Sequence, residues 1–303
     1  MTVAIDVRGL RKSYGDIAAV RGIDLSIEEG EVFALLGPNG AGKTTTVEIL
    51  EGYRTRTAGD VSVLGHDPAN GELSLKSRMG IVLQSTGVDR YLTVRETVEM
   101  YRGYYRRPRP ADEVIDLVGL GEKRNTKVSK LSGGQQRRLD VAIALAGDPE
   151  LLFLDEPTAG FDPSARRKAW DIVKNLASLG KTVFLTTHYM DEAQVLADRV
   201  AVIAHGRILA EGAPETLGGR DTGVAVVKFR VADGTPLPET LASQVTFENG
   251  MSVHRAADPA GFLHDLTGWA IGRGEPLDGL EVHRPTLEDV YLELTGERAQ
   301  EES

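Results

Sequence analysis

Short apolar runs separated by helical stretches dominate the first two thirds of the chain. Residues 3–7 alternate apolar and polar side chains, which is typical of a half-buried strand, and residues 17–27 hold further strand-like stretches. The runs at 32–36, 151–154 and 182–185 do not alternate, as expected for parallel strands covered on both faces. Helical patterns lie between these runs, so this region predicts an α/β domain with a mostly parallel sheet.

A change of pattern follows a predicted hairpin. Val200–Ile203 and Arg207–Leu209 flank a short turn and are typical of two hairpin strands. The stretch 211–223 is rich in Gly and Pro and indicates a linker. A new strand is expected at 224–231, which would begin a second domain.

The second domain contains a strong hairpin signal. Val245–Glu248 and Met251–His254 flank the dipeptide Asn249-Gly250. A type I′ turn needs a positive φ at both central positions, and Asn-Gly is the pair that best supplies it.

Two amphipathic helices are predicted after the hairpin. Asp258 is expected to cap the first helix, with Pro259 at its first position. The second is expected to start at Thr286, with Asp289 completing a capping-box spacing and Gly296 past its end. Their apolar stripes are Phe262, Leu263, Leu266, Trp269 and Ala270, and Leu287, Val290, Tyr291 and Leu294.

These patterns divide the chain into two predicted domains. An α/β domain is expected over residues 1–215 and a small α+β domain over 216–296. Residues 297–303 are expected to form a disordered tail.

The composition is that of an acidic globular protein without cysteine. Among 303 residues, 41% are hydrophobic, which excludes disorder over the whole chain. The 45 acidic and 35 basic residues give a net charge of −10, so we expect no nucleic-acid partner, because phosphate backbones are bound through clustered Lys and Arg. The lack of cysteine excludes a disulfide scaffold, a thiolate zinc site and a cysteine nucleophile.

The sequence predicts no membrane crossing by this chain itself. No apolar run approaches the roughly 18–20 residues of a spanning helix. Asp6 and Arg8 lie where a signal peptide would need its apolar stretch. We therefore expect that the chain does not cross a membrane by itself, although it can dock onto a protein that does. The lack of cysteine suits a reducing cytoplasm.

Residues 37–44 read GPNGAGKT, which is the P-loop pattern. Its glycines let backbone N–H groups converge on an anion, and the helix that opens near Lys43 adds its positive N-terminal end. Lys43 is expected to reach the β- and γ-phosphates of a bound nucleotide and the Thr44 hydroxyl to coordinate Mg²⁺. The predicted nucleotide cradle is Gly37, Pro38, Asn39, Gly40, Ala41, Gly42, Lys43, Thr44 and Thr45.

The segment LLFLDEP (151–157) is an apolar strand that ends in two carboxylates. Asp155 is expected at the carboxyl end of the strand, where open α/β sheets bind ligands, and it suits Mg²⁺ through water. Glu156 can accept a proton from an attacking water. An Asp-Glu pair alone could also be the acidic start of a helix, but together with the P-loop it indicates nucleotide hydrolysis.

Residues 131–135 read LSGGQ, and with GPNGAGKTT and LLFLDEP they resemble the ATP-binding cassette of ABC transporters over about residues 1–215. The resemblance implies a P-loop NTPase cassette with an additional antiparallel N-terminal sheet and a helical subdomain. It also implies a homodimer in which two cassettes pair head to tail. In that pairing the helix capped by Ser132 would face the ATP of the second cassette, with the predicted contacts Ser132, Gly133, Gly134 and Gln135.

The resemblance assigns four further residues. Tyr14 matches the aromatic that stacks on adenine, although it could be an ordinary strand-edge tyrosine. Gln84 matches the glutamine that contacts Mg²⁺ and the attacking water. Asp162 matches the loop that crosses the dimer interface, where Phe161 replaces the usual leucine. His188 matches the switch histidine on the γ-phosphate. The catalytic set is therefore Glu156, His188 and Gln84, and the metal ligands are Thr44, Gln84 and Asp155.

Two segments bear on the partner of the cassette. The family places a helical subdomain with a groove for a membrane permease at residues 85–110. The Tyr and Arg side chains of this segment suit such an interface, but they would equally suit a solvated helix end. They are Tyr101, Tyr104, Tyr105, Arg102, Arg106, Arg107 and Arg109. RPTLEDVYLELTG (284–296) resembles the end of cassette subunits in exporters of the daunorubicin-resistance type.

Together, the motifs predict an ATPase subunit that powers export of a drug, lipid or other small molecule. It would lie at the inner face of the membrane, bound to a separate polytopic permease. An importer ATPase and a non-transport ATPase acting on ribosomes or DNA are the alternatives. The C-terminal domain shows no catalytic constellation, so a regulatory or dimer-stabilising role is our hypothesis for it.

Overall fold

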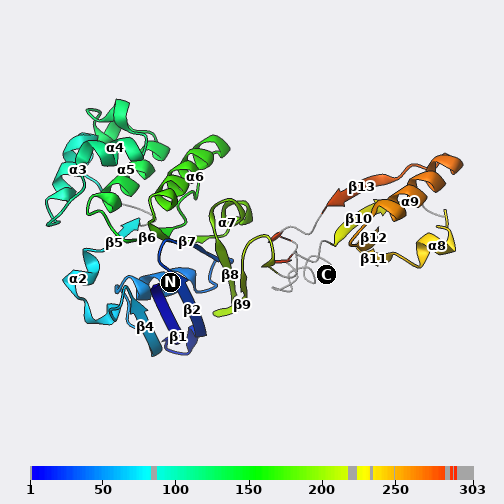
Figure 1. Ribbon diagram of the computed structural model, residues 1–303, viewed down its shortest axis with the longest axis horizontal. Helices are drawn as coiled ribbons and strands as arrows, with labels where there is room; N and C mark the ends of the chain where they lie inside the picture. The colour runs from blue at the N-terminus through cyan, green and yellow to red at the C-terminus, as the bar shows by residue number, and fades with distance from the viewer. Residues whose placement is uncertain are drawn as a thin grey trace. The chain divides into compact units, whose positions relative to one another are not determined.

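The computed structural model describes residues 2–82, 87–217, 224–232, 235–248, 250–283, 287–288 and 290–291. The chain separates into two compact units, Met1–Pro214 and Glu215–Ser303 (Figure 1). Each unit has its own buried apolar cluster. In the part of the chain that is described, no helix is both long enough and apolar enough to cross a membrane.

A six-stranded sheet forms the centre of the first unit, in the order β5-β6-β7-β3-β8-β9. All neighbouring strands are parallel except β9, which returns antiparallel to β8. The expected parallel sheet and the hairpin are therefore confirmed. The strands are β3 (Val32–Leu36), β5 (Met79–Val82), β6 (Leu151–Asp155), β7 (Thr182–Thr187), β8 (Arg199–Ala204) and β9 (Arg207–Gly212).

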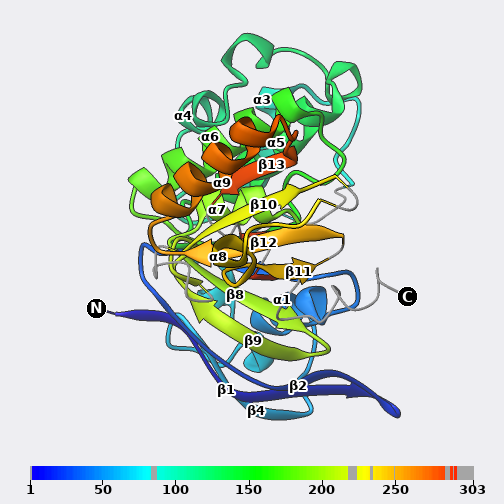
Figure 2. The same ribbon diagram turned by 90° about the vertical axis from the view of Figure 1, so that its right-hand side faces the viewer.

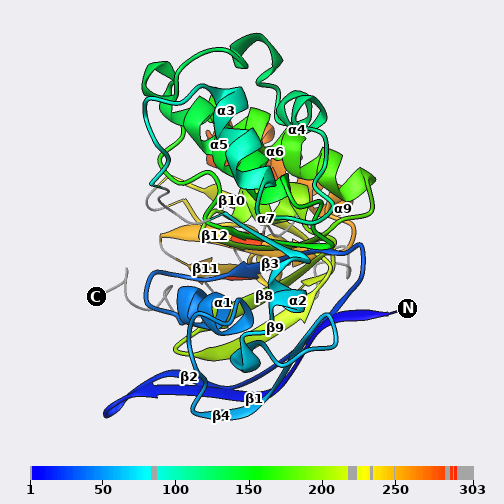
Figure 3. The same cartoon turned by 90° about the vertical axis from the view of Figure 1, so that its left-hand side faces the viewer.

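The central strands lack alternation because both of their faces are covered. Every residue of β3 and β7 is buried. On one side lies the antiparallel sheet β2-β1-β4, with α1 between it and the central sheet, and on the other side lies the group of helices α3 to α6 (Figure 3). The flanking strands are β1 (Val3–Tyr14), β2 (Ile17–Glu28) and β4 (Ala58–Val63). The helices are α1 (Lys43–Leu50), α2 (Leu73–Lys76), α3 (Val94–Arg102), α4 (Ala111–Leu117), α5 (Gly133–Leu145), α6 (Pro163–Ser178) and α7 (Met190–Leu196).

One predicted boundary in this unit is wrong. The linker was expected to begin at Glu211, but Glu211 and Gly212 belong to β9 and pair with Ala201 and Val200. Backbone pairing with an already buried strand thus outweighs the turn tendency of Gly, because each ladder hydrogen bond satisfies groups that would otherwise need water.

The second unit is a four-stranded antiparallel sheet in the order β11-β12-β10-β13, with α9 on one face (Figure 2). Phe262 and Leu266 of α9 pack with Val227 and Phe229 of β10. The elements are β10 (Ala225–Arg230), α8 (Glu239–Ala242), β11 (Thr246–Glu248), β12 (Met251–Ala256), α9 (Ala260–Arg273) and β13 (Asp278–His283).

The predicted hairpin and first helix of this unit are present with small shifts. Strands β11 and β12 pair around Gly250, whose φ is 73°. Helix α9 begins at Ala260, one residue later than expected, while the Asp258 carboxylate still accepts a hydrogen bond from Ala260 N at 3.0 Å. For the last predicted helix, Leu287, Val290 and Tyr291 are buried. Its ends, with Thr286, Asp289, Leu294 and Gly296, lie outside the described residues.

Candidate functional site

The P-loop connects the buried strand β3 to helix α1. Lys43 is the first residue of α1, and Gly42 before it has a φ of 105°. Free N–H groups and the positive end of the helix dipole meet at such a start, which makes it a site for anions. Thr46 donates from its hydroxyl to Gly42 O at 2.9 Å and so holds the first turn of the helix.

Two glycines of the loop have no room for a side chain. A Cβ on Gly37 would lie 2.2 Å from Ile203 O, and one on Gly42 would lie 2.6 Å from Ala19 O. The loop is therefore wedged against β8 and β2 while its backbone remains free to approach a phosphate. The loop backbone and the start of α1 therefore suit an anion by their geometry, without appeal to the sequence motif.

Lys43 is a buried cation held inside the loop. Its Nζ donates to Gly37 O at 2.7 Å and to Pro38 O at 3.2 Å, and it lies 3.5 Å from Glu156 Oε1. Burial lowers the pKa of Lys43, while the nearby carboxylates of Glu156 and Asp155 oppose that shift. The ammonium group has few competing contacts with water, so its charge acts strongly on whatever binds at the loop.

Glu156 follows β6 with a left-handed backbone, at a φ of 46°. This conformation costs a non-glycine residue about 1–2 kcal/mol. The strain is held by hydrogen bonds from Glu156 N to Thr186 O at 3.2 Å and to Thr186 Oγ1 at 3.1 Å. Thr186 Oγ1 also donates to Asp155 Oδ1 at 2.5 Å. The neighbouring strand β7 thus fixes the backbone of Glu156 and the carboxylate of Asp155.

His188 approaches the same carboxylate from the end of β7. Its Nδ1 lies 3.4 Å from Glu156 Oε1, without hydrogen-bond geometry to any described residue. The ring lies 4.0 Å from the Tyr189 ring, centroid to centroid, and the Arg166 guanidinium lies 4.1 Å from the centroid of Tyr189. Lys43 and His188 therefore meet at one oxygen of Glu156.

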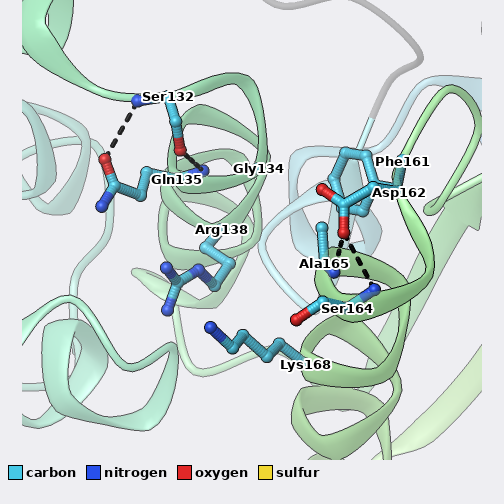
Figure 4. Close-up of a pocket in the computed structure, with 9 residues that line it drawn as sticks. All are labelled: Ser132, Gly134, Gln135, Arg138, Phe161, Asp162, Ser164, Ala165 and Lys168. Atoms are coloured by element: carbon cyan, nitrogen blue, oxygen red, sulfur yellow. Dashed lines mark hydrogen bonds between the residues drawn. The ribbon is translucent and has the colours of Figure 1, made fainter.

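A second group of candidate residues lines a separate pocket of about 220 Å³ (Figure 4). Ser132 and Gln135 form a complete capping box at the start of α5. Across the pocket, Asp162 caps α6 by accepting hydrogen bonds from Ser164 N at 2.8 Å and Ala165 N at 2.9 Å. Among the residues that line this pocket, none belongs to the P-loop.

The remaining predicted residues are placed as follows. Tyr14 ends β1, is 40% exposed, and has Lys12 Nζ at 5.0 Å and the Arg54 guanidinium at 5.4 Å from its ring centroid. Thr44 is exposed on the first turn of α1. Gln84 lies outside the described residues.

Two buried charges near the site were not predicted from the sequence. Arg137 of α5 donates to the backbone oxygens of Asp155 and Pro157. Glu192 of α7 accepts from Thr158 Oγ1 at 2.9 Å. Arg137 lies just past the LSGGQ segment and Glu192 lies four residues after His188, but in the sequence both look like ordinary polar helix residues.

A P-loop at the carboxyl end of a parallel sheet, with a carboxylate that neighbours both its lysine and a histidine, defines a nucleotide-binding protein of the P-loop NTPase class. Residues 20–159 match the family model described as ABC transporter. Similarity to curated relatives extends over the whole chain, and the chain belongs to the ABC transporter family as an ATPase subunit.

The daunorubicin/doxorubicin resistance ATP-binding protein DrrA of Streptomyces peucetius is 38% identical over 316 residues, covering 100% of this chain and 95% of that protein. A Nod factor export ATP-binding protein I from Burkholderia orbicola is 39% identical over 312 residues, covering 99% of this chain and 100% of that protein. These relatives confirm the resemblance to the daunorubicin-resistance type.

The solved structures agree with the fold. A dimeric structure of MJ0796, described as a bacterial ABC transporter cassette, is 28% identical with a TM-score of 0.62 and covers 69% of this chain and 98% of its own. The ADP conformation of the cassette MJ1267, 24% identical with a TM-score of 0.64, covers 71% of this chain and 92% of its own. The predicted cassette fold is confirmed.

Proposed function

We propose that this chain hydrolyses ATP to drive export of a small molecule through a separate membrane permease. The observation that carries the chemical part is the meeting of Lys43 and His188 at Glu156 Oε1, at 3.5 Å and 3.4 Å. The relatives that match over the full length are named for drug resistance and for Nod factor export, which favours export over the importer and non-transport alternatives.

In the proposed reaction, each of the three side chains has its own role. Lys43 exchanges its bonds to the loop carbonyls for bonds to phosphate oxygens, and His188 donates to the terminal phosphate. The Glu156 carboxylate accepts the proton of the attacking water. Lys43 and His188, which both lie beside Oε1, orient this carboxylate toward the phosphate end of the site.

Magnesium is the proposed metal. Thr44 offers an exposed hydroxyl and Asp155 a carboxylate at the strand end, which are the hard oxygen donors that Mg²⁺ prefers. Mg²⁺, when bound, neutralises negative charge on the phosphates. The proposed third ligand, Gln84, lies outside the described residues.

The active unit is proposed to be a head-to-tail homodimer. Within one chain, the pocket at Ser132 and Asp162 is separate from the P-loop. The Ser132 pocket of each copy is therefore available to the P-loop of the other copy. The capped start of α5 presents N–H groups that suit a phosphate. Each of the two active sites would then combine the P-loop of one copy with Ser132, Gly133, Gly134 and Gln135 of the other.

A groove of about 1020 Å³ between α2 and the segment after α3 is the proposed permease contact. Leu73 is 82% exposed and Tyr104 is 77% exposed at this groove, beside Lys76, Arg106 and Arg107. Exposed aromatic and arginine side chains are enriched at protein interfaces. Docking here would hold the chain at the inner face of the membrane.

Three measurements test this proposal. Purified chain should release phosphate from ATP only with Mg²⁺, and Lys43→Ala should abolish nucleotide binding.

Because the chain has no cysteine, Tyr104→Cys carries a unique thiol for a photo-crosslinker. In membranes that hold the permease, the crosslink should capture a polytopic membrane protein, whereas Phe247→Cys, another exposed aromatic position, should not. Equal capture from both positions would contradict the proposed docking site.

A further inference from the structure

Arg137 is a buried cation that runs from helix α5 to the loop that carries Glu156. It lies on the helix that Ser132 caps, and only 9% of the residue is exposed. A guanidinium is rarely buried without a specific set of acceptors, because losing its hydration is costly. The acceptors of Arg137 therefore indicate what the residue does.

Its acceptors lie on both sides of Glu156. Nη2 donates to Asp155 O at 2.9 Å, and Nε donates to Pro157 O at 3.3 Å. A guanidinium is a rigid planar fork, so two of its bonds fix the relative orientation of two acceptors. The residue between these carbonyls is Glu156, with its left-handed backbone.

The charge of Arg137 is compensated from neighbouring elements. Its Nη1 lies 3.9 Å from Asp140 Oδ2 on the same helix. Burial lowers the pKa of Arg137, and the carboxylates of Asp140, Asp155 and Glu192 oppose this shift. Such compensation stabilises the charged guanidinium beneath the loop. The charge strengthens its hydrogen bonds to the backbone oxygens of Asp155 and Pro157.

The far side of the loop is held by a second buried charge. Glu192 accepts from Thr158 Oγ1 at 2.9 Å and from Trp170 Nε1 at 3.1 Å. Thr158 is two residues past Glu156, and Trp170 belongs to α6. The loop is thus tied to α5 on one side and to α6 and α7 on the other, which leaves its backbone little freedom.

We propose that Arg137 is a positioning residue for hydrolysis, which locks the backbone on both sides of Glu156 to the helix that starts at Ser132. The inference rests on the proposed role of Glu156 as general base. It goes further in stating that the base is aimed by α5 of its own chain. The pocket at the start of α5 and the base would then move as one rigid unit.

A double-mutant cycle on the full chain tests this role, with phosphate release, ATP affinity and melting temperature measured for each variant. Arg137→Met should lower kcat about 10- to 100-fold, with ATP affinity changed less than about twofold, because it misaims the base without touching the P-loop. In the Glu156→Gln background, the same change should lower the residual rate by less than about twofold, because no base remains to be misaimed.

Arg124→Met is the matched control. Arg124 also donates to a backbone oxygen, that of Gly121, and pairs with Asp112 and Asp116, all away from the loop at Glu156. It should leave kcat unchanged. Equal losses from Arg137→Met in both backgrounds, or no loss in either, would overturn the proposal. A normal rate for Glu156→Gln would instead refute the general-base role.

If Arg137→Met does not fold, Arg137→Lys decides. Lysine keeps the charge but cannot bond both carbonyls in one plane, so kcat should still fall at least about fivefold at unchanged ATP affinity. Wild-type kcat in a folded Arg137→Lys protein would contradict a positioning role.

Discussion

At the residue scale, a single carboxylate oxygen organises the site. Glu156 Oε1 has Lys43 Nζ and His188 Nδ1 as neighbours, although these residues come from three different segments of the chain. The side chains of Lys43 and Glu156 are only 5% and 14% exposed, so their opposite charges interact in surroundings poor in water. The strained, left-handed backbone at Glu156 thus orients its carboxylate toward the P-loop.

The direct test of this arrangement is Glu156→Gln. We expect kcat to fall about 10²- to 10⁴-fold, because an amide cannot accept the proton of the attacking water. ATP affinity should be retained, and a dimer should accumulate in the presence of ATP. Phosphate release and size-exclusion chromatography measure the two effects.

Glu150→Gln is the control for that substitution. Glu150 precedes the same strand and pairs with Arg78 at 2.7 Å, far from the P-loop end of β6. Its kcat should match that of the wild type. A Glu156→Gln protein that turns over ATP at the normal rate would exclude Glu156 as the base.

At the element scale, helix ends determine where ligands can bind. Two helices of the described chain carry a complete capping box, α3 through Thr93 and Glu96 and α5 through Ser132 and Gln135. The two caps are alike in local structure. The cap of α5 differs in lining a pocket with Asp162, so only this one has a further proposed role.

Replacing Ser132 by Arg should block pairing of two chains. ATP binding by one chain should be nearly unchanged, because the pocket at Ser132 is lined by no residue of its own P-loop, while ATP-induced dimers and hydrolysis should be lost. Thr93→Arg controls for the lost cap, which costs about 1 kcal/mol in either helix. Equilibrium dialysis and light scattering with ATP compare the two. Hydrolysis in a strictly monomeric Ser132→Arg protein would disprove the shared site.

Glu51, at the C-terminal end of α1, gives a prediction about pH. Burial, with the charges of Asp155 and Glu48, raises its pKa to about 8. In the unfolded chain the pKa is near the ordinary value of about 4.3, so the folded state binds the proton more tightly. Its stabilising contribution is full below the unfolded pKa and is lost as the pH rises toward 8.

Glu51→Gln should therefore flatten the pH dependence of stability. Between pH 5 and 8, the wild type should lose roughly 3–4 kcal/mol more of its unfolding free energy than the variant. Urea unfolding at several pH values measures this difference. Parallel curves for the two proteins would mean that Glu51 titrates normally.

At the scale of the whole molecule, the two units have separate cores and separate sheets. Every described residue of the candidate site lies in the first unit, Met1–Pro214. The relatives, however, match over the full chain, so the second unit is shared by this type of subunit and is not specific to this protein.

A chain truncated after Pro214 should fold and bind ATP with unchanged affinity. If the second unit stabilises the dimer, the dissociation constant of the ATP-bound dimer should rise at least about tenfold, or 1.4 kcal/mol. Circular dichroism and analytical ultracentrifugation with ATP compare the truncated and full chains. Unchanged dimer affinity, ATPase rate and transport would remove the proposed role for the second unit.

The sequence by itself determined which segments become strands and where the phosphate loop lies. Those are local properties, because buried parallel strands need continuous apolar runs and a P-loop needs glycines directly before a helix. The Gly37 and Gly42 positions follow from such rules. The carboxylate pair after an apolar strand indicated Glu156, and the resemblance named His188, but neither could place the two side chains next to each other.

Only the tertiary structure decided that Lys43, Glu156 and His188 lie together, and the physical reason is the order of the strands in the sheet. The neighbours β6, β7 and β3 bring Glu156, His188 and Lys43 to one edge of the sheet, although up to about 145 positions separate them in the chain. The same holds for Arg137 and Glu192. Their role depends on distant backbone atoms that come within reach only when the helices pack on the sheet, and no local pattern records such a contact.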